Sequence, residues 1–457
     1  MLKSTIFREY DIRGVADVEL VSDGIAALGQ ALGTYLRRHG GPNLCLGRDT
    51  RLSSTRLRDA LMLGLKASGC HVTDIGVQPT PLLYYATVHS KADGGVMITG
   101  SHNPPEFNGF KTVLGAGTIH GEAIQEIRRM IETGDLDCGA GSETTADVAT
   151  PYVEEVAAQF HFPRRIRVVV DAGNGTGGPA MHRILERLNV DAEEMFFEMD
   201  GRFPNHHPDP TVPRNLEALI ARVRETKADL GIAFDGDADR IGAVDERGSI
   251  LYGDQLMILY AREILTRKPG ATFIGEVKCS QLMYDDLAAR GGHPIMWKTG
   301  HSLIKAKMKE SHAELAGEMS GHMFFADRYY GYDDALYAAC RLIEIVANSG
   351  RPLSTHLADL PQTVNTPEIR FDCPDEIKFE VVRLASAELR AGHQTVDVDG
   401  VRVLFADGWG LVRASNTQPV LVMRFEAKTP ELLTQYRREV ESVVERSKRQ
   451  AQRTGGD

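Results

Sequence analysis

Hydrophobic positions in the first 150 residues repeat with two periods, one typical of helices and one typical of buried strands. Apolar side chains three or four residues apart predict amphipathic helices at 23–38, 54–68 and 121–131, the second ended by Gly69. Short continuous apolar runs predict strands at 43–47, 71–75 and 95–98. We expect the polar segment 133–150 to be a linker, so the first α/β domain spans 1–148.

The same alternation continues through the middle of the chain. A continuous apolar run at 165–171 predicts a strand buried on both faces, followed by strands at 228–234 and 240–244. After a helix that begins at Gly253, the pattern predicts strands at 272–277, 294–297 and 314–316 and helices at 281–290, 302–310 and 332–348. We therefore predict two further α/β domains, at 149–250 and 251–363.

The last part of the chain has a different pattern. Strands are predicted at 368–371, 395–397, 401–405, 410–413 and 420–426, and they bracket only one helix, at 376–389. A second helix is predicted at 430–446, and the terminal residues 450–457 are expected to be a frayed tail. Strands in adjacent hairpins, with the helices set aside, indicate an α+β domain with an antiparallel sheet at 364–457.

Composition narrows the class of protein. A chain of 457 residues, with 42% hydrophobic and 25% charged residues, is an ordinary globular protein of about three or four domains. The net charge is −11 and basic residues form no stripe, which argues against nucleic acid and anionic membranes as partners. No apolar run approaches the roughly 18–20 residues of a spanning helix. We expect a monomer.

The spacing of the cysteines and the composition of the first residues bear on the cellular compartment. The six cysteines have no C-x-x-C spacing, and most stand among apolar neighbours, where a free thiol behaves as a small hydrophobic side chain. The first nine residues lack the apolar segment of a signal peptide. We therefore expect a cytoplasmic protein.

The most informative segment is the loop at 99–111, TGSHNPPEFNGFK, which follows a predicted buried strand. It carries the hydroxyl of Ser101, the imidazole of His102 and the ammonium of Lys111. Pro104 and Pro105 restrict the backbone, so the loop should have a defined shape. Open α/β sheets place their sites at such strand ends. The alternative is a surface turn with an incidental serine.

A second loop places three carboxylates between two predicted strands. Asp235, Asp237 and Asp239 are two residues apart, so they project to one side of an extended backbone, where they repel one another unless a cation lies between them. Oxygen ligands suit Mg²⁺ or Ca²⁺, and open positions favour Mg²⁺. An EF-hand is excluded because Arg240 occupies the position that needs glycine and the flanks are strands. A solvated acidic turn without metal stays open.

Other polar loops add to this picture. The loop at 317–322, GEMSGH, offers alternating polar side chains for sugar hydroxyls, and the loop at 413–417, RASNT, offers donors for a phosphate; each could instead be a simple hairpin turn. The segment 10–14, YDIRG, is another compact polar loop, and its charges could simply form a structural ion pair. The glycine-rich turn at 172–178 lacks the spacing of a dinucleotide site. The serine loop, the aspartate loop, the loop for sugar hydroxyls and the loop for phosphate, one in each predicted domain, together indicate phosphoryl transfer on a phosphosugar.

These segments, in this order, resemble those of the α-D-phosphohexomutases, and within them the bacterial phosphomannomutase/phosphoglucomutase branch. The resemblance covers nearly the whole chain. It implies four domains around a central cleft, three of similar α/β topology with mixed sheets and a C-terminal α+β domain. It also implies a phosphoserine, Mg²⁺, and a hexose 1,6-bisphosphate as intermediate and activator.

The resemblance assigns residues to these roles. Ser101 is similar to the phosphoserine, whose phosphate oxygen joins Asp235, Asp237 and Asp239 around the Mg²⁺ ion. Charged groups similar to those around the reacting oxygen, any of which could help proton transfer, are Arg13, His102 and Lys111. Arg240 is similar to a residue that contacts the phosphoserine loop or the substrate. Residues similar to those that bind the phosphosugar are Tyr10, Lys278, His301, Glu318, Ser320, His322, Arg413, Ser415, Asn416 and Thr417.

The implied activity is interconversion of hexose 1-phosphate and hexose 6-phosphate, with a bisphosphate that reorients between the two transfers. The loop GEMSGH resembles that of dual-specificity enzymes for mannose and glucose. Three alternatives remain: a phosphoglucosamine mutase, a catalytically silent sugar-phosphate-binding protein, and a metal-dependent phosphatase with a serine intermediate. The intact Ser101 and the three aspartates count against the silent protein.

Overall fold

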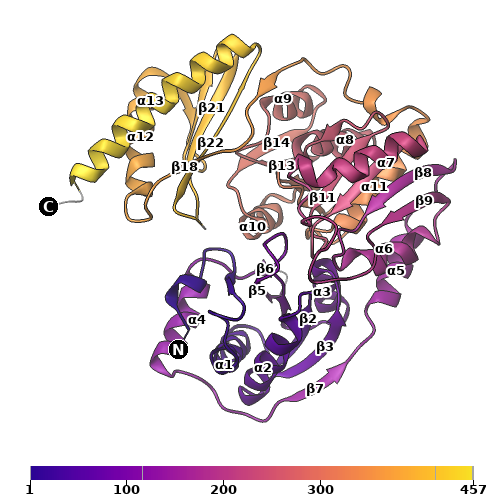
Figure 1. Ribbon diagram of the computed structural model, residues 1–457, viewed down its shortest axis with the longest axis vertical. Coiled ribbons are helices and arrows are strands. Elements are labelled where there is room, and N and C mark those ends of the chain that lie inside the picture. Colours follow the sequence, from indigo (N-terminus) through magenta and orange to yellow (C-terminus); the bar gives the residue numbers. More distant parts are fainter. Residues whose placement is uncertain (1, 116, 417, 455–457) are drawn as a thin grey trace.

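The structure of the protein is a computed structural model that describes residues 2–115, 117–416 and 418–454. Within these residues the strands form four sheets, one for each of four units that follow one another in an arc (Figure 1). The arc brings the C-terminal unit back towards the first, so loops far apart in the sequence meet near its centre. The predicted α/β architecture with an antiparallel C-terminal sheet is confirmed.

The first sheet has the order β1-β5-β4-β2-β3-β7, with β6 paired to β5. The central strands are parallel, whereas β5 runs antiparallel to both β1 and β4. The strands are β1 (Ile12–Val15), β2 (Asn43–Arg48), β3 (His71–Val77), β4 (Gly94–Ile98), β5 (Phe107–Leu114), β6 (Gly117–Thr118) and β7 (Ser142–Thr145). The helices are η1 (Ser4–Ile6), α1 (Ser22–His39), α2 (Ser54–Ala67), α3 (Thr80–His89) and α4 (Glu122–Thr133).

The second sheet, β12-β11-β10-β8-β9, is also mixed, because β8 is parallel to β9 and β10 while β11 is antiparallel to β10. Its strands are β8 (Ile166–Asp171), β9 (Val190–Met195), β10 (Leu230–Phe234), β11 (Ile241–Asp245) and β12 (Ile250–Leu251). The helices of this part of the chain are α5 (Ala149–Ala158), α6 (Gly177–Leu185), η2 (Pro213–Leu216) and α7 (Glu217–Thr226). The tight turn between β10 and β11 carries the three aspartates.

The third sheet, β14-β13-β15-β16, repeats this mixed arrangement. Its strands are β13 (Thr272–Glu276), β14 (His293–Trp297), β15 (Leu315–Gly317) and β16 (Met323–Phe325). The helices are α8 (Gly253–Arg267), α9 (Gln281–Ala289), α10 (His301–Ser311), α11 (Ala335–Ser349) and η3 (Leu353–Thr355). One hydrophobic core is continuous from α3 through α5 to α11, so the first three units are packed together.

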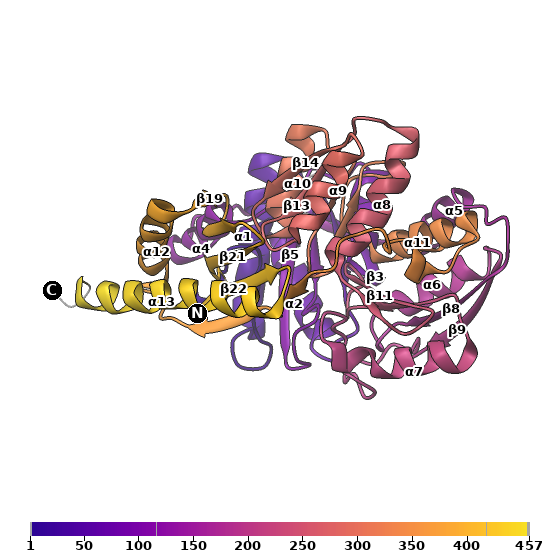
Figure 2. The same ribbon diagram turned by 90° about the horizontal axis from the view of Figure 1, so that it is seen from above.

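The C-terminal sheet, β17-β22-β21-β20-β19 with β18 paired to β22, is antiparallel throughout. Its elements are β17 (Val364–Asn365), β18 (Ile369–Asp372), α12 (Lys378–Gly392), β19 (Gln394–Val396), β20 (Val401–Phe405), β21 (Gly408–Ala414), β22 (Val420–Ala427) and α13 (Pro430–Thr454). This unit has its own core, and α13 lies along its outer edge (Figure 2).

A few contacts tie the C-terminal unit to the third. Arg402 on β20 is fully buried, and its Nη1 donates to the carbonyls of Val277 at 2.7 Å and Cys279 at 2.8 Å. Its guanidinium lies 3.7 Å from the ring centroid of Trp409. Val277, Trp409 and Leu411 form a small hydrophobic cluster beside it. Arg424 on β22 also donates to the carbonyl of Lys278, so two arginines of the C-terminal sheet bind the segment 277–279.

Two predictions about local structure were wrong. The segment expected to be a linker contains β7, which pairs in parallel with β3 at the edge of the first sheet. Its four residues are all exposed, so no apolar alternation announces the strand. The tail expected to fray continues α13 to Thr454, with Ala451 buried. Among the described residues, no helix is both long and apolar enough to cross a membrane.

Candidate active site

The serine loop begins where β4 ends at Ile98, in the middle of the first sheet. Ser101 adopts a positive φ of 48°, which is uncommon for a residue other than glycine. Its backbone N–H donates to Thr99 Oγ1 at 2.9 Å, and Asn103 N–H donates to the Gly100 carbonyl at 2.9 Å. The loop is thus shaped by its own hydrogen bonds, and Ser101 is only 2% exposed.

The buried side chain of Arg51 supports the backbone of this loop, a role that the sequence did not predict. Arg51 Nη2 donates to the Ser101 carbonyl at 2.7 Å, and Asp49 Oδ2 accepts from Arg51 Nε at 3.1 Å. The same guanidinium donates to the carbonyls of Asn103, Pro104 and Phe107. The sequence did offer a signal for this role, because Asp49 and Arg51 are oppositely charged and directly follow the strand β2. Arg51 fixes the strained conformation of the loop.

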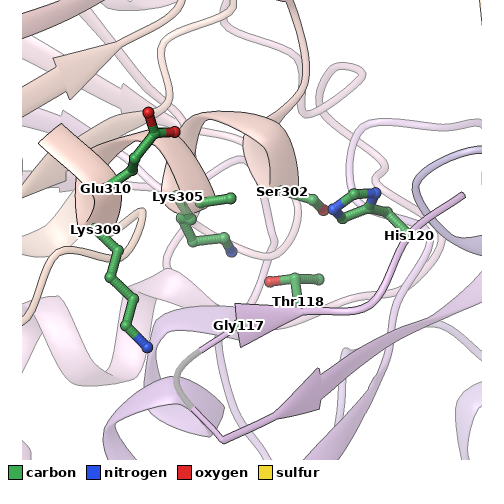
Figure 3. A pocket seen from close by; sticks show the side chains of 8 residues that line it. Gly117, Thr118, His120, Ser302, Lys305, Lys309 and Glu310 are labelled. Carbon is green, nitrogen blue, oxygen red and sulfur yellow. The ribbon is translucent and has the colours of Figure 1, made fainter. Parts of the chain in front are cut away.

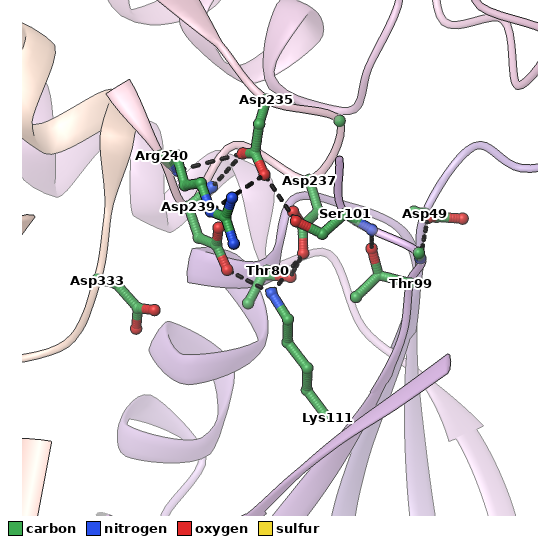
Figure 4. A network of polar contacts seen from close by, with 12 residues as sticks. Asp49, Thr80, Thr99, Ser101, Lys111, Asp235, Asp237, Asp239, Arg240 and Asp333 are labelled. Atoms are coloured by element: carbon green, nitrogen blue, oxygen red, sulfur yellow. Dashed lines mark hydrogen bonds and ion pairs between the residues drawn. The ribbon is translucent and has the colours of Figure 1, made fainter. Parts of the chain in front are cut away.

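The three aspartates of the β10–β11 turn face the serine (Figure 4). Asp235, Asp237 and Asp239 are each fully buried, and one carboxylate oxygen from each lies within 4.8 Å of the others. Ser101 Oγ donates to Asp235 Oδ2 at 2.7 Å. Asp237 Oδ1 is buried without a hydrogen-bond partner among the described residues. An all-oxygen group with an unpaired acceptor fits a divalent cation such as Mg²⁺.

Lys111 on β5 partly neutralises this cluster. Its Nζ donates to Asp237 Oδ2 at 2.8 Å and also to Asp239, while Thr80 Oγ1 donates to Asp237 Oδ2 at 2.6 Å. Burial, reinforced by the other two carboxylates, raises the pKa of Asp235 well above its usual range. Burial alone would lower the pKa of Lys111, but the carboxylates outweigh it and raise that pKa. The cluster therefore has a deficit of positive charge.

His102 and Arg13 lie beside the serine. His102 Nδ1 is 3.2 Å from Ser101 Oγ, and the His102 carbonyl accepts a hydrogen bond from His207. Burial, together with the positive charges of Arg240 and Arg13, lowers the pKa of His102 well below its usual range. Arg13 forms an ion pair with Asp11. His102 is therefore a neutral imidazole beside the hydroxyl.

Arg240 connects the aspartate turn to the loop after β15. Its backbone N–H donates to Asp235 Oδ1 at 3.2 Å, and its Nε lies 3.2 Å from His322 Nε2. The backbones of Arg240 and His322 also form an isolated β-bridge. The guanidinium therefore stands between the metal-binding candidates and the candidate sugar loop.

The loop at 317–322 holds its polar side chains in a network. Glu318 Oε1 accepts from Gly300 N–H at 2.8 Å, and Glu318 Oε2 lies 2.7 Å from His322 Nδ1, which is also 3.2 Å from Ser320 Oγ. His322 Nε2 lies 3.2 Å from Asp239 Oδ1. Burial opposes the charged ring, but Asp239 and Glu318 outweigh it and raise the pKa of His322 to about 9.

Lys278 and a second residue missed from the sequence, Glu276, lie at the end of β13. Glu276 is fully buried and accepts from Thr299 Oγ1 at 2.6 Å and from Met319 N–H at 2.7 Å. Lys278 Nζ lies 3.2 Å from Glu368 Oε2 and 3.5 Å from Glu276 Oε1. Glu276 thus holds together the loops that carry His301 and Glu318.

The loop at 413–417 projects from the C-terminal sheet. Arg413 Nε donates to Asp399 Oδ2 at 2.9 Å, and Ser415 Oγ accepts from Gln418 N–H at 3.2 Å. Arg413 is 5% exposed. Thr417 lies outside the described residues. Asp399, which orients the arginine, was not found in the sequence because it belongs to another turn.

Tyr10 joins this loop to the rest of the site. Its hydroxyl accepts from Asn416 Nδ2 at 2.6 Å and donates to the Thr299 carbonyl at 3.0 Å. Burial raises the pKa of Tyr10 to about 12, so the phenol stays protonated. The structure thus brings together the described candidate residues from all four units.

A cavity of about 370 Å³ separates β6 from α10 (Figure 3). The residues that line it are Gly117, Thr118, His120, Ser302, Lys305, Ala306, Lys309 and Glu310. Ser302 and His120 point towards one another across it. On the α10 side the cavity is lined from Ser302, the second residue of the helix, to Glu310.

Family models match the chain from end to end. They describe phosphoglucomutase/phosphomannomutase alpha/beta/alpha domain I at residues 4–137, domain II at 150–248, domain III at 252–364 and the C-terminal domain at 368–443. The chain is 44% identical to the phosphomannomutase/phosphoglucomutase of Pseudomonas aeruginosa over 447 residues, 97% of this chain and 96% of that one. It is 43% identical to the phosphoglucomutase of Neisseria gonorrhoeae over 445 residues, 96% of each chain.

Solved structures agree with these relatives. A phosphoglucomutase/phosphomannomutase family protein from Burkholderia thailandensis superposes with a TM-score of 0.92 at 42% identity, and the match covers 98% of each chain. A phosphomannomutase-like structure from Thermus thermophilus superposes with a TM-score of 0.82 at 24% identity, over 97% of this chain and all of that one. The second likeness bears on the fold alone.

Proposed function

Because this chain belongs to the phosphoglucomutase/phosphomannomutase family, we propose that it interconverts hexose 1-phosphate and hexose 6-phosphate, with mannose, glucose or both as the sugar. The observation that carries the proposal is the placement of Ser101 Oγ, 2.7 Å from Asp235 in a cluster of three buried carboxylates. A hydroxyl so placed can hold a phosphoryl group beside a divalent cation.

Asp235, Asp237 and Asp239 would hold a Mg²⁺ ion together with a phosphate oxygen on Ser101. Such an ion neutralises negative charge on the phosphoryl group during transfer. Lys111, beside Asp237, and the guanidinium of Arg240, 4.0 Å from Asp235 Oδ2, supply further positive charge. Neutral His102, 3.2 Å from Ser101 Oγ, can accept a proton there.

The substrate is bound at its two ends. Arg413, oriented by Asp399, would bind the phosphate that does not react, since a guanidinium matches phosphate with two parallel hydrogen bonds. Glu318, His322 and Lys278 would bind the sugar hydroxyls. The bisphosphate intermediate must turn around so that its other phosphate reaches Ser101, so these groups must accept both orientations. A bisphosphate that binds protein with an unphosphorylated Ser101 would transfer one phosphoryl group to that serine and leave as a hexose monophosphate, so hexose 1,6-bisphosphate would also act as activator.

The finer description of the protein belongs to the same proposal. We propose domains at 1–148, 149–250, 251–363 and 364–457, each contributing at least one loop to the site. We also propose a cytoplasmic monomer. The six cysteines are free and five of them are buried, which fits a reducing compartment.

The deciding experiment measures turnover and phosphorylation together. Purified protein is assayed with glucose 1-phosphate, mannose 1-phosphate and glucosamine 6-phosphate in the presence of Mg²⁺, and phosphopeptides are mapped. Mutase activity on glucose or mannose phosphates, with phosphate on Ser101, supports the proposal. Preference for the amino sugar would indicate a phosphoglucosamine mutase, stoichiometric release of inorganic phosphate a phosphatase, and binding without turnover a silent protein.

A further inference from the structure

His301 and Asp333 each have one polar atom without a hydrogen bond, and these two atoms lie near one another. His301 Nδ1 and Asp333 Oδ2 are both buried and have no hydrogen-bond partner within the described part of the chain. They are 3.9 Å apart. A movement of about 1 Å would bring them to hydrogen-bond distance. Because an unpaired buried polar atom is costly, two complementary ones so close together indicate a contact that forms during the working cycle.

Asp333 is held firmly on its other side. Its Oδ1 accepts from Lys305 Nζ at 3.0 Å, and that ammonium also lies 3.1 Å from the hydroxyl of Tyr84. Its backbone forms a β-bridge with Phe324, and the carboxyl group is fully buried. These contacts hold Oδ2 in place, so any adjustment falls to His301, the first residue of α10.

Other neighbours of Asp333 Oδ2 are already satisfied. Asp333 also lies near Asp239 and His322, since one ligand atom from each of the three falls within 4.8 Å of the others. Both ring nitrogens of His322 are engaged, with Glu318 and with Asp239. Figure 4 shows Asp333 apart from the dashed network around Lys111. His301 is therefore the neighbour left to bind it.

The His301 ring is neutral, so its single N–H can be on either nitrogen. Burial, together with the positive charges of Lys305 and Lys111, lowers the pKa of His301 well below its usual range. With the proton on Nε2, the Nδ1 lone pair would face a carboxylate oxygen, which is repulsive. With the proton on Nδ1, the ring donates to Asp333 and Nε2 becomes an acceptor.

We propose that Asp333 is a positioning residue for His301: its Oδ2 accepts the Nδ1–H and fixes the tautomer in which Nε2 accepts a hydrogen bond from a sugar hydroxyl. The inference rests on the proposed function, which places His301 at the sugar. An aspartate that selects the tautomer of a histidine is an established device of enzyme active sites. In this protein the Asp333 carboxylate is also linked to the first unit, because Lys305, which binds Asp333, contacts Tyr84 of α3.

Asp333→Asn separates this role from simple packing. A carboxylate offers two acceptor oxygens, one to Lys305 and one to His301, whereas an amide offers a single oxygen. One of the two donors must then face an NH₂ group. Asp334→Asn is the matched control: Asp334 is also buried, at the start of α11, but it binds Tyr152 and the backbone of Tyr337 instead.

The experiment reads the tautomer directly by ¹⁵N NMR of histidine-labelled protein, with the His301 signal assigned from a His301→Gln sample. In the unmodified protein with glucose 1-phosphate we expect the proton on Nδ1, and in Asp333→Asn a shift towards Nε2 with kcat/KM about tenfold lower. Asp334→Asn should leave the tautomer unchanged.

Two results would overturn the inference: an Nε2–H tautomer in the unmodified protein, or an unchanged tautomer in Asp333→Asn with the same loss of kcat/KM as in Asp334→Asn. If Asp333→Asn does not fold, the unmodified protein alone decides. If the unmodified protein shows no turnover, the proposed function fails, while the NMR signal still tests the pairing.

Discussion

Asn416 Nδ2 donates a 2.6 Å hydrogen bond to the hydroxyl of Tyr10, although 406 positions separate the two residues in the sequence. The same hydroxyl donates to Thr299, so one phenol connects the first, third and C-terminal units. The C-terminal unit has its own core. We therefore expect the Tyr10 hydroxyl to help hold this unit against the rest of the site.

Removing the Tyr10 hydroxyl should favour opening. Tyr10→Phe deletes two hydrogen bonds, each worth about 1 kcal/mol, and leaves the ring in place. We expect a larger radius of gyration by small-angle X-ray scattering and a several-fold higher KM. Tyr436→Phe, a change within the C-terminal unit, is the control. Scattering curves identical to those of the unmodified protein would contradict the role of this contact.

Ser101→Ala should abolish transfer without unfolding the protein. The side chain is small, and the loop is held mainly by Arg51 and by backbone hydrogen bonds. Turnover should fall by about a thousandfold or more, since alanine has no hydroxyl to carry the phosphoryl group. Phosphopeptide mapping should find phosphate on Ser101 in the unmodified protein, and label on another residue would refute the assignment.

Neutralising one aspartate should weaken Mg²⁺ binding. Asp237→Asn removes about a third of the ligand charge and one of the two carboxylate partners of Lys111. We expect at least about tenfold weaker Mg²⁺ activation. Asp245→Asn, at the far end of β11, is the control because this carboxylate only closes a turn. Full activity after exhaustive chelation would exclude a metal requirement.

Loss of the candidate phosphate clamp should affect binding and retention of the intermediate. A charge-assisted contact is worth about 1.5–3 kcal/mol, so Arg413→Ala should raise KM for both hexose 1-phosphates by about tenfold or more. Closure over the site excludes water, so the variant should also lose more bisphosphate to solvent. Steady-state kinetics with trapping of the intermediate measures both effects. If both stay unchanged, the loop is only a hairpin turn.

The ion pair of His206 and Asp171, which are not among the candidate site residues, should make stability depend on pH. His206 Nε2 lies 2.9 Å from Asp171 Oδ2; burial opposes the charged ring, but this hydrogen bond outweighs it and raises the pKa of His206. The contribution is full below the unfolded pKa of about 6.5 and is lost as pH rises through the higher folded pKa. His206→Asn should therefore lower the free energy of unfolding by about 1 kcal/mol in mild acid and by less above that range. Denaturant titrations at two pH values test this, and an equal loss at both would contradict it.

Local patterns were enough to predict the two most specific loops. The spacing of Asp235, Asp237 and Asp239 and the composition around Ser101 depend on neighbours within a few residues, and the fold class followed from hydrophobic periodicity. Arg51, Glu276 and Asp333 were not predicted, because each acts on groups that only the tertiary structure brings near. Arg51, for example, binds a loop 50 residues further along the chain. The strand β7 was missed because an exposed, polar edge strand lacks an apolar period.

The buried Arg402 has a consequence for how product leaves. Its two acceptor carbonyls belong to Val277 and Cys279, which flank Lys278 in the sequence. If the C-terminal unit rotates, we expect these hydrogen bonds to move the segment that carries Lys278, which we propose binds the sugar. The arginine would then couple rotation of the unit to the shape of the sugar site. We expect release of the phosphate at Arg413 and of the sugar at Lys278 to be a single mechanical event.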